Sequence, residues 1–290
     1  MPFTVPKNLA ESAERRGWSE WVATLPRAVE TLTQRWSLEV GDPFQPGGQT
    51  AWVAPARSST FGDVVLKVAS RHYEAFDEAT GLCEWDGDGA IRLFAAEDID
   101  EATTALLVER CRPGTALSRL PDTDQDRALS NILRRLWKEP PFAKTFRPLQ
   151  QMCDQWADEC ELKLSDGRVH TDPGLTREGI ALFRSLPGTA VRNVLLCTDL
   201  HADNVLASDR EPWLAIDPKP YVGDPTYDAL QHLLNCEDRL AQGPSDLIKH
   251  IAGLLDLDSE RLSLWMFARC IIESPDWPEL VPIARQLAPR

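Results

Sequence analysis

The chain has 290 residues, 43% of them apolar, which is enough to bury a core in one large or two smaller lobes, and we expect two. Its formal net charge of -14 argues against binding to nucleic acid, because neutralising phosphates needs a clustered excess of Lys and Arg. The polar N-terminal segment and the absence of any long apolar run predict a cytoplasmic protein without a membrane span. The acidity is compatible with a cationic substrate, although solubility alone also explains it.

The seven Cys residues occur singly, in an odd number and without a Cys-x-x-Cys pair. This pattern favours reduced thiols over a disulfide framework or a zinc site. Cys153 and Cys160 stand seven apart on one face of a predicted helix, so we expect them to be core residues.

The N-terminal part of the chain combines helical and strand-like patterns. After a first short helix, apolar residues recur at intervals of three and four over residues 18–33, which predicts an amphipathic helix. Short runs rich in Val, Trp and Leu follow, separated by Gly and Pro, and predict antiparallel strands. Further predicted elements are strands over 36–40, 50–54 and 63–68, a helix over 71–84, and strands over 90–94 and 105–109.

The C-terminal part has mainly helical patterns, interrupted by one β-rich stretch over residues 191–217. The sequence therefore predicts an α+β protein, with an N-terminal lobe over 1–111 and a C-terminal lobe over 112–290. The predicted helices of the second lobe cover 118–137, 148–163, 177–185, 227–240 and 259–273.

The β-rich stretch carries the residues that best indicate chemistry. An apolar strand leads to Asp199, Asn204 follows five residues later, and a predicted hairpin leads to Asp217. Phosphoryl transfer needs one carboxylate to accept a proton and further oxygen ligands to hold a metal ion. We expect Asp199 to be the catalytic base and Asn204 and Asp217 to hold Mg²⁺. The alternative is a turn whose side chains cap the backbone, which the spacing of all three residues disfavours.

Residues 199–204, Asp-Leu-His-Ala-Asp-Asn, followed by Asp217, resemble the catalytic loop and metal-binding Asp of the protein-kinase-like fold, in the version found in aminoglycoside phosphotransferases. Residues 85–93 and 216–228 resemble the streptomycin 6-kinase and hydroxyurea phosphotransferase branch. The resemblance covers about residues 47–240. It implies a two-lobed kinase-like fold and ATP-dependent phosphorylation of a hydroxyl group on a small cationic compound, first of all an aminoglycoside such as streptomycin, in antibiotic resistance. Hydroxyurea or another small metabolite is the alternative substrate.

The same resemblance implies an ion pair for the ATP phosphates. Lys67 lies in the strand where kinases keep a phosphate-binding Lys, and its partner is expected on the next helix. Glu78 is the preferred partner and Glu74 the fallback. A structural ion pair without nucleotide is the alternative, since a Lys in an apolar strand needs a partner in any case.

Further nucleotide contacts are implied for two backbone segments. Gly47 and Gly48 lie between the first two predicted strands, where N–H groups could face phosphates, although an ordinary hairpin turn gives the same pattern. Glu109 and Cys111 precede Pro113-Gly114 and resemble the interlobe hinge, whose main chain would contact adenine.

The sequence departs from the family pattern at two places. Cys197-Thr198 replaces the usual His-Gly before the catalytic Asp, and Pro218-Lys219 replaces the usual Phe-Gly after the metal-binding Asp. The Pro stiffens the second segment, so we do not expect it to move as an activation switch. His201 is expected to brace the loop and not to act as a base, because Asp199 has the better position.

Acidic residues elsewhere are candidates for the acceptor site. Asp154 and Asp158 lie on one face of a predicted helix and Asp224 follows the metal site, which could form an acidic cleft. A solvated helix face is the alternative for the first two. The expected partner is a small molecule, and the protein is expected to be a monomer or homodimer.

Two other classes of function remain open at this point. A pseudokinase would bind nucleotide without turnover, but the proposed catalytic, metal-binding and phosphate-binding residues are all present. A metal-dependent hydrolase could use the same carboxylates, but it has no use for the N-terminal half.

Overall fold

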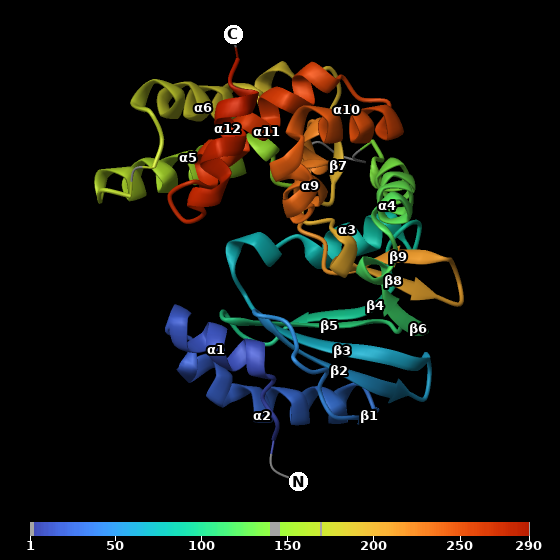
Figure 1. The fold of residues 1–290 in the computed structure, drawn as a ribbon. Helices are drawn as coiled ribbons and strands as arrows, with labels where there is room; N and C mark the ends of the chain where they lie inside the picture. The colour runs from blue at the N-terminus through green and yellow to red at the C-terminus, as the bar shows by residue number, and fades with distance from the viewer. Residues whose placement is uncertain (1–2, 140–145, 169, 290) are drawn as a thin grey trace. The chain divides into compact units, whose positions relative to one another are not determined.

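The computed structural model describes residues 3–139, 146–168 and 170–289, except the side chain of Glu74. The chain divides into two compact units. The first comprises Met1–Gly114 with Ser208–Pro212, and the second comprises Thr115–Ala207 with Trp213–Arg290 (Figure 1). The return of residues 208–212 to the first unit has no counterpart in the predicted lobes.

The first unit contains a five-stranded antiparallel sheet in the order β1-β2-β3-β5-β4. Its helices are α1 (Lys7–Arg16), α2 (Ser19–Arg35) and α3 (Glu78–Trp85). Its strands are β1 (Leu38–Val40), β2 (Ala51–Ser58), β3 (Gly62–Ser70), β4 (Leu93–Asp98) and β5 (Thr103–Glu109).

Helices α1 and α2 cover one face of this sheet (Figure 1). Burial alternates along β3, so that Leu66 and Val68 are fully buried against the helices. Because side chains alternate between the faces of a strand, Lys67 points to the opposite face. The period-2 pattern that buries the core therefore also sets the direction of Lys67.

Two predicted elements of this unit are displaced. The helix predicted over 71–84 begins only at Glu78, because the N–H of Arg71 donates to the carbonyl of Ala102 (2.7 Å) and the chain still follows the sheet there. The strand predicted over 90–94 is β4 instead, whose pairing with β5 starts later and includes a bulge. The other predicted strands are found with shifted ends, as is usual for boundaries read from sequence.

The second unit is mainly helical, as predicted, and α11 lies at its centre. Trp265 and eight further residues of α11 are buried. Gly179 of α6 allows a close approach, since a Cβ there would lie 2.5 Å from Cγ1 of Ile271 in α11. The helices are α4 (Asp122–Leu136), α5 (Leu149–Ser165), α6 (Pro173–Ser185), α7 (Pro225–Asp228), α8 (Leu230–Asn235), α9 (Glu237–Gln242), α10 (Pro244–Leu255), α11 (Ser259–Glu273) and α12 (Val281–Leu287).

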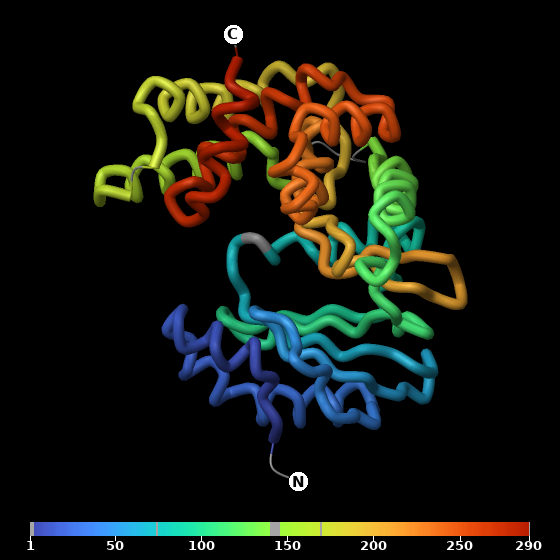
Figure 2. Tube along the Cα trace, in the orientation of Figure 1, coloured from blue at the N-terminus to red at the C-terminus, as the bar shows by residue number. Residues whose placement is uncertain are grey.

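Helices α10 and α12 are absent from the predicted elements, and the helix predicted over 227–240 is three short helices, α7 to α9. The orange-to-red part of the tube in Figure 2 follows the chain from α10 to α12. The chain breaks between α8 and α9 at Cys236, whose ψ of 49° is not helical. The separate directions of α8 and α9 matter for the pocket described below.

Two small sheets are formed mainly by residues of the second unit. Strands β7 (Val194–Leu196) and β10 (Tyr221–Gly223) pair antiparallel, and β8 (Val205–Ser208) and β9 (Trp213–Ala215) form a hairpin with β6 (Pro113–Ala116) beside β8. The predicted β-rich stretch is thus a strand, a loop and a hairpin.

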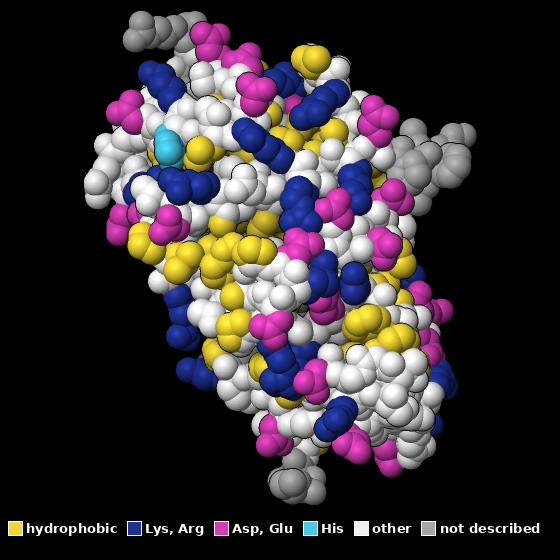
Figure 3. Space-filling view, turned by 90° about the vertical axis from the view of Figure 1, so that its right-hand side faces the viewer, with side chains coloured by type: hydrophobic (Ala, Val, Ile, Leu, Met, Phe, Trp, Pro, Cys, Tyr) yellow, Lys and Arg dark blue, Asp and Glu magenta, His cyan; other side chains and the backbone are white. Residues whose placement is uncertain are grey.

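No described helix has both the length and the apolar character needed to cross a membrane. On the face shown in Figure 3, Lys and Arg side chains are interspersed with Asp and Glu. All seven Cys residues are free thiols, and five of them are buried.

Candidate active site

The start of the loop at Asp199 is anchored by a buried carboxylate. Asp228 accepts hydrogen bonds from the backbone N–H groups of Cys197 (3.0 Å) and Thr198 (2.5 Å) and from the indole of Trp137 (3.0 Å). Burial raises the pKa of Asp228 to about 6, although these donors act in the opposite direction. Thr198 has a φ of 52°, a left-handed conformation that is strained for a β-branched residue, so the anchor holds the loop in an unusual shape.

Within the loop, a side-chain amide fixes the geometry. The amide nitrogen of Asn204 donates to the carbonyl of Asp199 (3.0 Å), and the backbone N–H of Asn204 donates to the carbonyl of His201 (2.9 Å). Because this hydrogen bond occupies the amide nitrogen of Asn204, the amide oxygen is the atom that could bind a cation.

Asn204 and Asp217 lie at the same end of the β8–β9 hairpin. Asn204 immediately precedes β8, and the N–H of Ile216, just beyond β9, donates to the carbonyl of Asn204 (2.9 Å). Asp217 follows directly, with a φ of 53°. An amide and a carboxylate oxygen at one hairpin end fit Mg²⁺, which takes few protein oxygens and completes its shell with water or phosphate.

Lys219 shows that Asp199 and Asp217 also converge. Its Nζ lies 2.8 Å from Oδ1 of Asp217 and 3.9 Å from Oδ2 of Asp199. The predicted base and the predicted metal ligand therefore share one ammonium group, which sequence reasoning treated only as a departure from the family pattern.

His201 is half-buried, and burial lowers its pKa, which favours the neutral imidazole. Its Nδ1 is buried and has no hydrogen-bond partner among the described residues. The role of His201 as a brace stays a prediction.

In the first unit, the ion pair between Lys67 and Glu78 is present. Nζ of Lys67 lies 2.6 and 2.7 Å from the two carboxylate oxygens of Glu78, and both side chains are largely buried. The side chain of the fallback partner, Glu74, lies outside the described residues. The phosphate-binding role of the pair stays a prediction.

The side chain of Glu109 is engaged within the first unit. Arg210 donates to both of its oxygens, from Nε at 2.8 Å and from Nη2 at 2.9 Å. Cys111 is buried, and burial raises its pKa to about 12, so its thiol stays protonated. Any contact of these residues with a nucleotide is therefore left to the main chain, as the hinge prediction assumes.

Gly47 has both packing and backbone reasons to be glycine. Its φ is 77°, and a Cβ there would lie 2.5 Å from the side chain of Pro6. The carbonyl of Gly47 accepts a hydrogen bond from the side chain of Asn8 (2.9 Å), which ties the turn to α1. Phosphate binding by Gly47 and Gly48 stays a prediction.

The acidic residues predicted at the acceptor site have other partners. Asp158 pairs with Arg184 (2.6 Å), which also donates to the backbone carbonyl of Asp154 (3.2 Å). Asp224 is buried, caps α7 and accepts hydrogen bonds from Arg261 and Trp265, both at 2.7 Å. The buried carboxylate of Asp224 is therefore occupied by protein donors, whereas an acceptor role for the more exposed Asp154 and Asp158 stays a prediction.

A different acidic pocket adjoins the catalytic loop. It has a volume of about 380 Å³ and lies within the second unit. Four carboxylates line it, together with two cationic side chains. The lining includes Ser118, Asp122 and Gln125 near the start of α4, His201 and Asp203 of the loop, and His232, Asn235, Glu237, Asp238 and Arg239 of α8 and α9.

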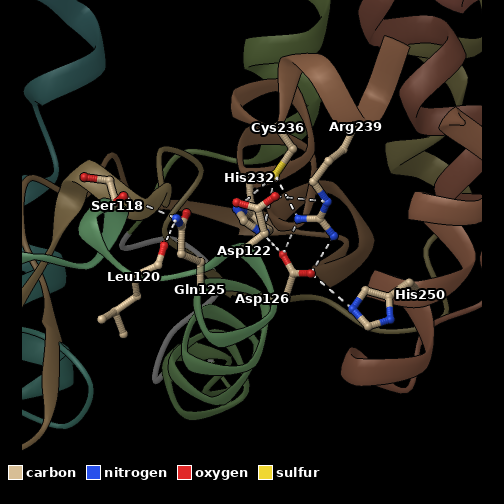
Figure 4. Close-up of polar contacts among 9 residues, drawn as sticks. All are labelled: Ser118, Leu120, Asp122, Gln125, Asp126, His232, Cys236, Arg239 and His250. Carbon is tan, nitrogen blue, oxygen red and sulfur yellow. Dashed lines mark hydrogen bonds and ion pairs between the residues drawn. The ribbon is translucent and has the colours of Figure 1, made fainter. Parts of the chain in front are cut away.

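Asp126 of α4 contacts two residues that line this pocket, His232 and Arg239 (Figure 4). This carboxylate is 0% exposed and receives His232 of α8 (2.7 Å), His250 of α10 (3.1 Å) and both terminal nitrogens of Arg239 of α9 (3.0 and 2.7 Å). Burial alone would lower the pKa of His232, but its hydrogen bonds to Asp126 and Cys236 raise it to about 9. Asp126 is thus the counter-ion of an ionic cluster that joins three helices to α4.

A metal site would be another interpretation of this cluster. Asp126, His232 and Cys236 place a carboxylate, an imidazole and a thiol within 4.8 Å of one another. However, Sγ of Cys236 lies 3.9 Å from both ring nitrogens of His232, so it is not aligned with the lone pair of either. Arg239 also points a cation at both Asp126 and Cys236. The geometry fits an ion-pair network and not a zinc centre.

Comparison with known proteins agrees with these features. Residues 35–280 match the family described as aminoglycoside/hydroxyurea antibiotic resistance kinase. The chain is 32% identical over 277 residues to the streptomycin 6-kinase of Streptomyces griseus, covering 92% of this chain and 88% of that protein. It is also 32% identical over 291 residues to the hydroxyurea phosphotransferase of Kitasatospora aureofaciens, covering 96% and 82%.

Solved structures with the same fold include a thermostable mutant of the aminoglycoside phosphotransferase APH(4)-Ia in complex with ADP and hygromycin B. Its TM-score is 0.59 at 14% identity, covering 90% of this chain and 99% of that one. The choline kinase LicA from Streptococcus pneumoniae has a TM-score of 0.54 at 14% identity, covering 89% and 91%. The predicted protein-kinase-like fold is confirmed. Both curated relatives are named as enzymes that transfer phosphate to small compounds, and the chain belongs to the aminoglycoside/hydroxyurea antibiotic resistance kinases.

Proposed function

We propose that the protein transfers the γ-phosphoryl group of ATP to a hydroxyl group of a small cationic compound, with an aminoglycoside such as streptomycin as the first candidate. The convergence of Asp199 and Asp217 on one ammonium group, with Asn204 at the same hairpin end, carries this proposal. The streptomycin 6-kinase relatives support the choice of acceptor.

Each residue has a distinct role in the proposed reaction. Asp199 accepts the proton of the acceptor hydroxyl, and Asn204 and Asp217 hold Mg²⁺, which would neutralise charge on the phosphates. Lys67, oriented by Glu78, binds ATP phosphates. Asp228 keeps the loop in place through the backbone bonds described above.

The acidic pocket beside the loop is the proposed acceptor site. Its exposed carboxylates, Asp122, Asp203, Glu237 and Asp238, attract cations, and charge steering raises the local concentration of a cationic acceptor. A second pocket of about 440 Å³ shares Glu237 and Asp238 and presents the exposed indole of Trp277, which suits cation–π contact. Streptomycin fits this chemistry better than hydroxyurea, which carries no positive charge at neutral pH.

The test is ATP consumption by the purified protein with streptomycin, other aminoglycosides, hydroxyurea and amino sugars, each at a series of concentrations. We expect saturable turnover with a cationic acceptor and a rise in its KM with salt, because screening weakens the attraction. Turnover only with an uncharged acceptor would contradict the assignment of the acidic pocket. A pair of wild-type and Asp199→Asn proteins controls for contaminating ATPases.

A further inference from the structure

Lys219 lies at the point where the proposed base and the proposed metal ligand meet. Its side chain is 13% exposed, and Nζ contacts Oδ1 of Asp217 (2.8 Å), the carbonyl of Asp217 (3.1 Å) and, at 3.9 Å, Oδ2 of Asp199. The roles proposed above for the reaction do not include this ammonium group.

The backbone of Lys219 is tied to the catalytic loop on both sides. Its N–H donates to the carbonyl of Cys197 (2.9 Å), and its carbonyl accepts from the hydroxyl of Thr198 (2.5 Å). The residues on either side are Pro218 and Pro220, whose rings fix their φ angles, and Pro220 disfavours a helical conformation for Lys219. These contacts hold the backbone of Lys219 beside the catalytic loop, and the contacts of Nζ with Asp217 direct the ammonium group toward the carboxylates.

A cation at this place would favour the reaction. Charge spreads over the oxygens of the transferred phosphoryl group in the transition state, and fixed cations and donors aimed at it supply much of the rate enhancement. The loop over residues 199–204 contains neither Lys nor Arg. In the proposed reaction the phosphoryl group passes from ATP on the side of Asp217 to the acceptor hydroxyl beside Asp199, so an ammonium group within reach of both carboxylates would also lie within its reach.

We propose that Lys219 is a further catalytic residue whose ammonium binds the oxygens of the transferred phosphoryl group. The inference rests on the proposed function. In the step, the acceptor oxygen forms a bond to the γ-phosphorus, and the bond from this phosphorus to the bridging oxygen breaks. The electron pair leaves with ADP, the hydroxyl proton passes to Asp199, and Lys219 stays protonated throughout.

The first test is steady-state kinetics of Lys219→Met, which keeps the length of the side chain and removes its charge. We expect kcat to fall by roughly 10²–10³-fold, the range for loss of one transition-state donor, with the acceptor KM within about threefold of wild type. The matched control is Lys163→Met on α5, whose lysine pairs with Asp276 at the surface. We expect the control to keep wild-type kcat. A Lys219→Met protein with wild-type kcat would overturn the inference.

The second test separates a catalytic role from a structural one and needs no acceptor. ADP binding is measured by calorimetry with Mg²⁺, with and without aluminium fluoride, which mimics the transferred phosphoryl group. We expect aluminium fluoride to tighten the binding of ADP to wild type, and this tightening to be at least about tenfold smaller in Lys219→Met. The affinity for ADP alone should differ between the two proteins by less than about threefold. Equal tightening in both proteins would overturn the inference.

A charge-conserving variant covers the case in which Lys219→Met fails to fold. Lys219→Arg keeps the positive charge but places it on a planar guanidinium group at the end of a longer side chain. We expect this variant to keep part of the fluoride effect and to lose at least about tenfold in kcat, and wild-type values for both would overturn the inference. If wild type phosphorylates no acceptor, the proposed function fails, whereas the ADP measurements still report on Lys219.

Discussion

Replacing Asp126 by Asn tests the ionic cluster at the acceptor pocket. The substitution keeps the shape of the side chain but leaves His232 and Arg239 without their buried counter-ion. Removing one partner of a buried ion pair costs about 3–5 kcal/mol, because the remaining charge is uncompensated. For a unit of this size that corresponds to a fall in Tm of roughly 6–20 °C. The matched control is Asp122→Asn, one turn earlier in α4, where the side chain is 61% exposed and 3.8 Å from Arg239. We expect it to cost below about 1 kcal/mol.

The pH dependence of the Tm difference identifies the cause. The pKa of His232 is raised from 6.5 to about 9 in the folded protein. Because the pKa is raised, the charged imidazole of His232 stabilises the fold, and this stabilisation is complete at pH values below the pKa of the unfolded chain, 6.5. The contribution, about 3 kcal/mol, is lost as the pH rises through the pKa of the folded protein, about 9. The difference between wild type and Asp126→Asn should thus be largest below about pH 6.5 and shrink as the pH rises toward and through about 9. The groups around His232 are Asp122 and Asp126 of α4, Cys236, Arg239 of α9, His250 of α10 and His201 of the loop.

The assay is thermal unfolding followed by circular dichroism from about pH 6 to about pH 10, on wild type, Asp126→Asn and Asp122→Asn. A Tm of Asp126→Asn within about 3 °C of wild type near neutral pH would refute the energetic argument. A large difference that stays constant across the whole pH range would refute the assignment to His232.

Three further predictions concern the reaction. The double variant Glu237→Gln, Asp238→Asn should raise the KM of a cationic acceptor by roughly tenfold with little change in kcat, and steady-state kinetics would show the split. Glu78→Ala should weaken ATP binding nearly as much as Lys67→Ala, because the carboxylate orients the ammonium, and calorimetry with ATP measures both; unchanged affinity would contradict the pair's role. Asp228→Asn should lower kcat and cost about 1–3 kcal/mol of stability, since one backbone N–H of the loop loses its acceptor. Wild-type kinetics in that variant would contradict the anchor.

The sequence predicted the parts of the site that are local in the chain. Asp199, Asn204 and Asp217 belong to one loop and one hairpin, so their spacing nearly determines their arrangement. The ion pair of Lys67 with Glu78 also spans only a strand and the following helix. In both cases the alternation of side chains along a strand and a short connection were sufficient to predict which residues come together.

The acceptor site could not be predicted in the same way. The partners of Asp126 lie 106 to 124 residues further along the chain, and no spacing pattern links them. Asp224 is close to Asp217 in sequence, but Trp265 and Arg261 of α11 bury it, which only tertiary packing decides. Glu237 lies at the pocket because the helix predicted over 227–240 is broken at Cys236, and helical periodicity does not reveal such a break.

The central claim is phosphoryl transfer with Asp199 as proton acceptor, and one measurement tests it most directly. Wild type and Asp199→Asn are incubated with Mg²⁺, streptomycin and ATP labelled in its γ-phosphate, and the label in the acceptor is quantified, with ADP binding measured as a control for folding. We expect wild type to label the acceptor and Asp199→Asn to lose at least about 10²-fold in rate while it still binds ADP. Label transfer by Asp199→Asn at the wild-type rate would contradict the account.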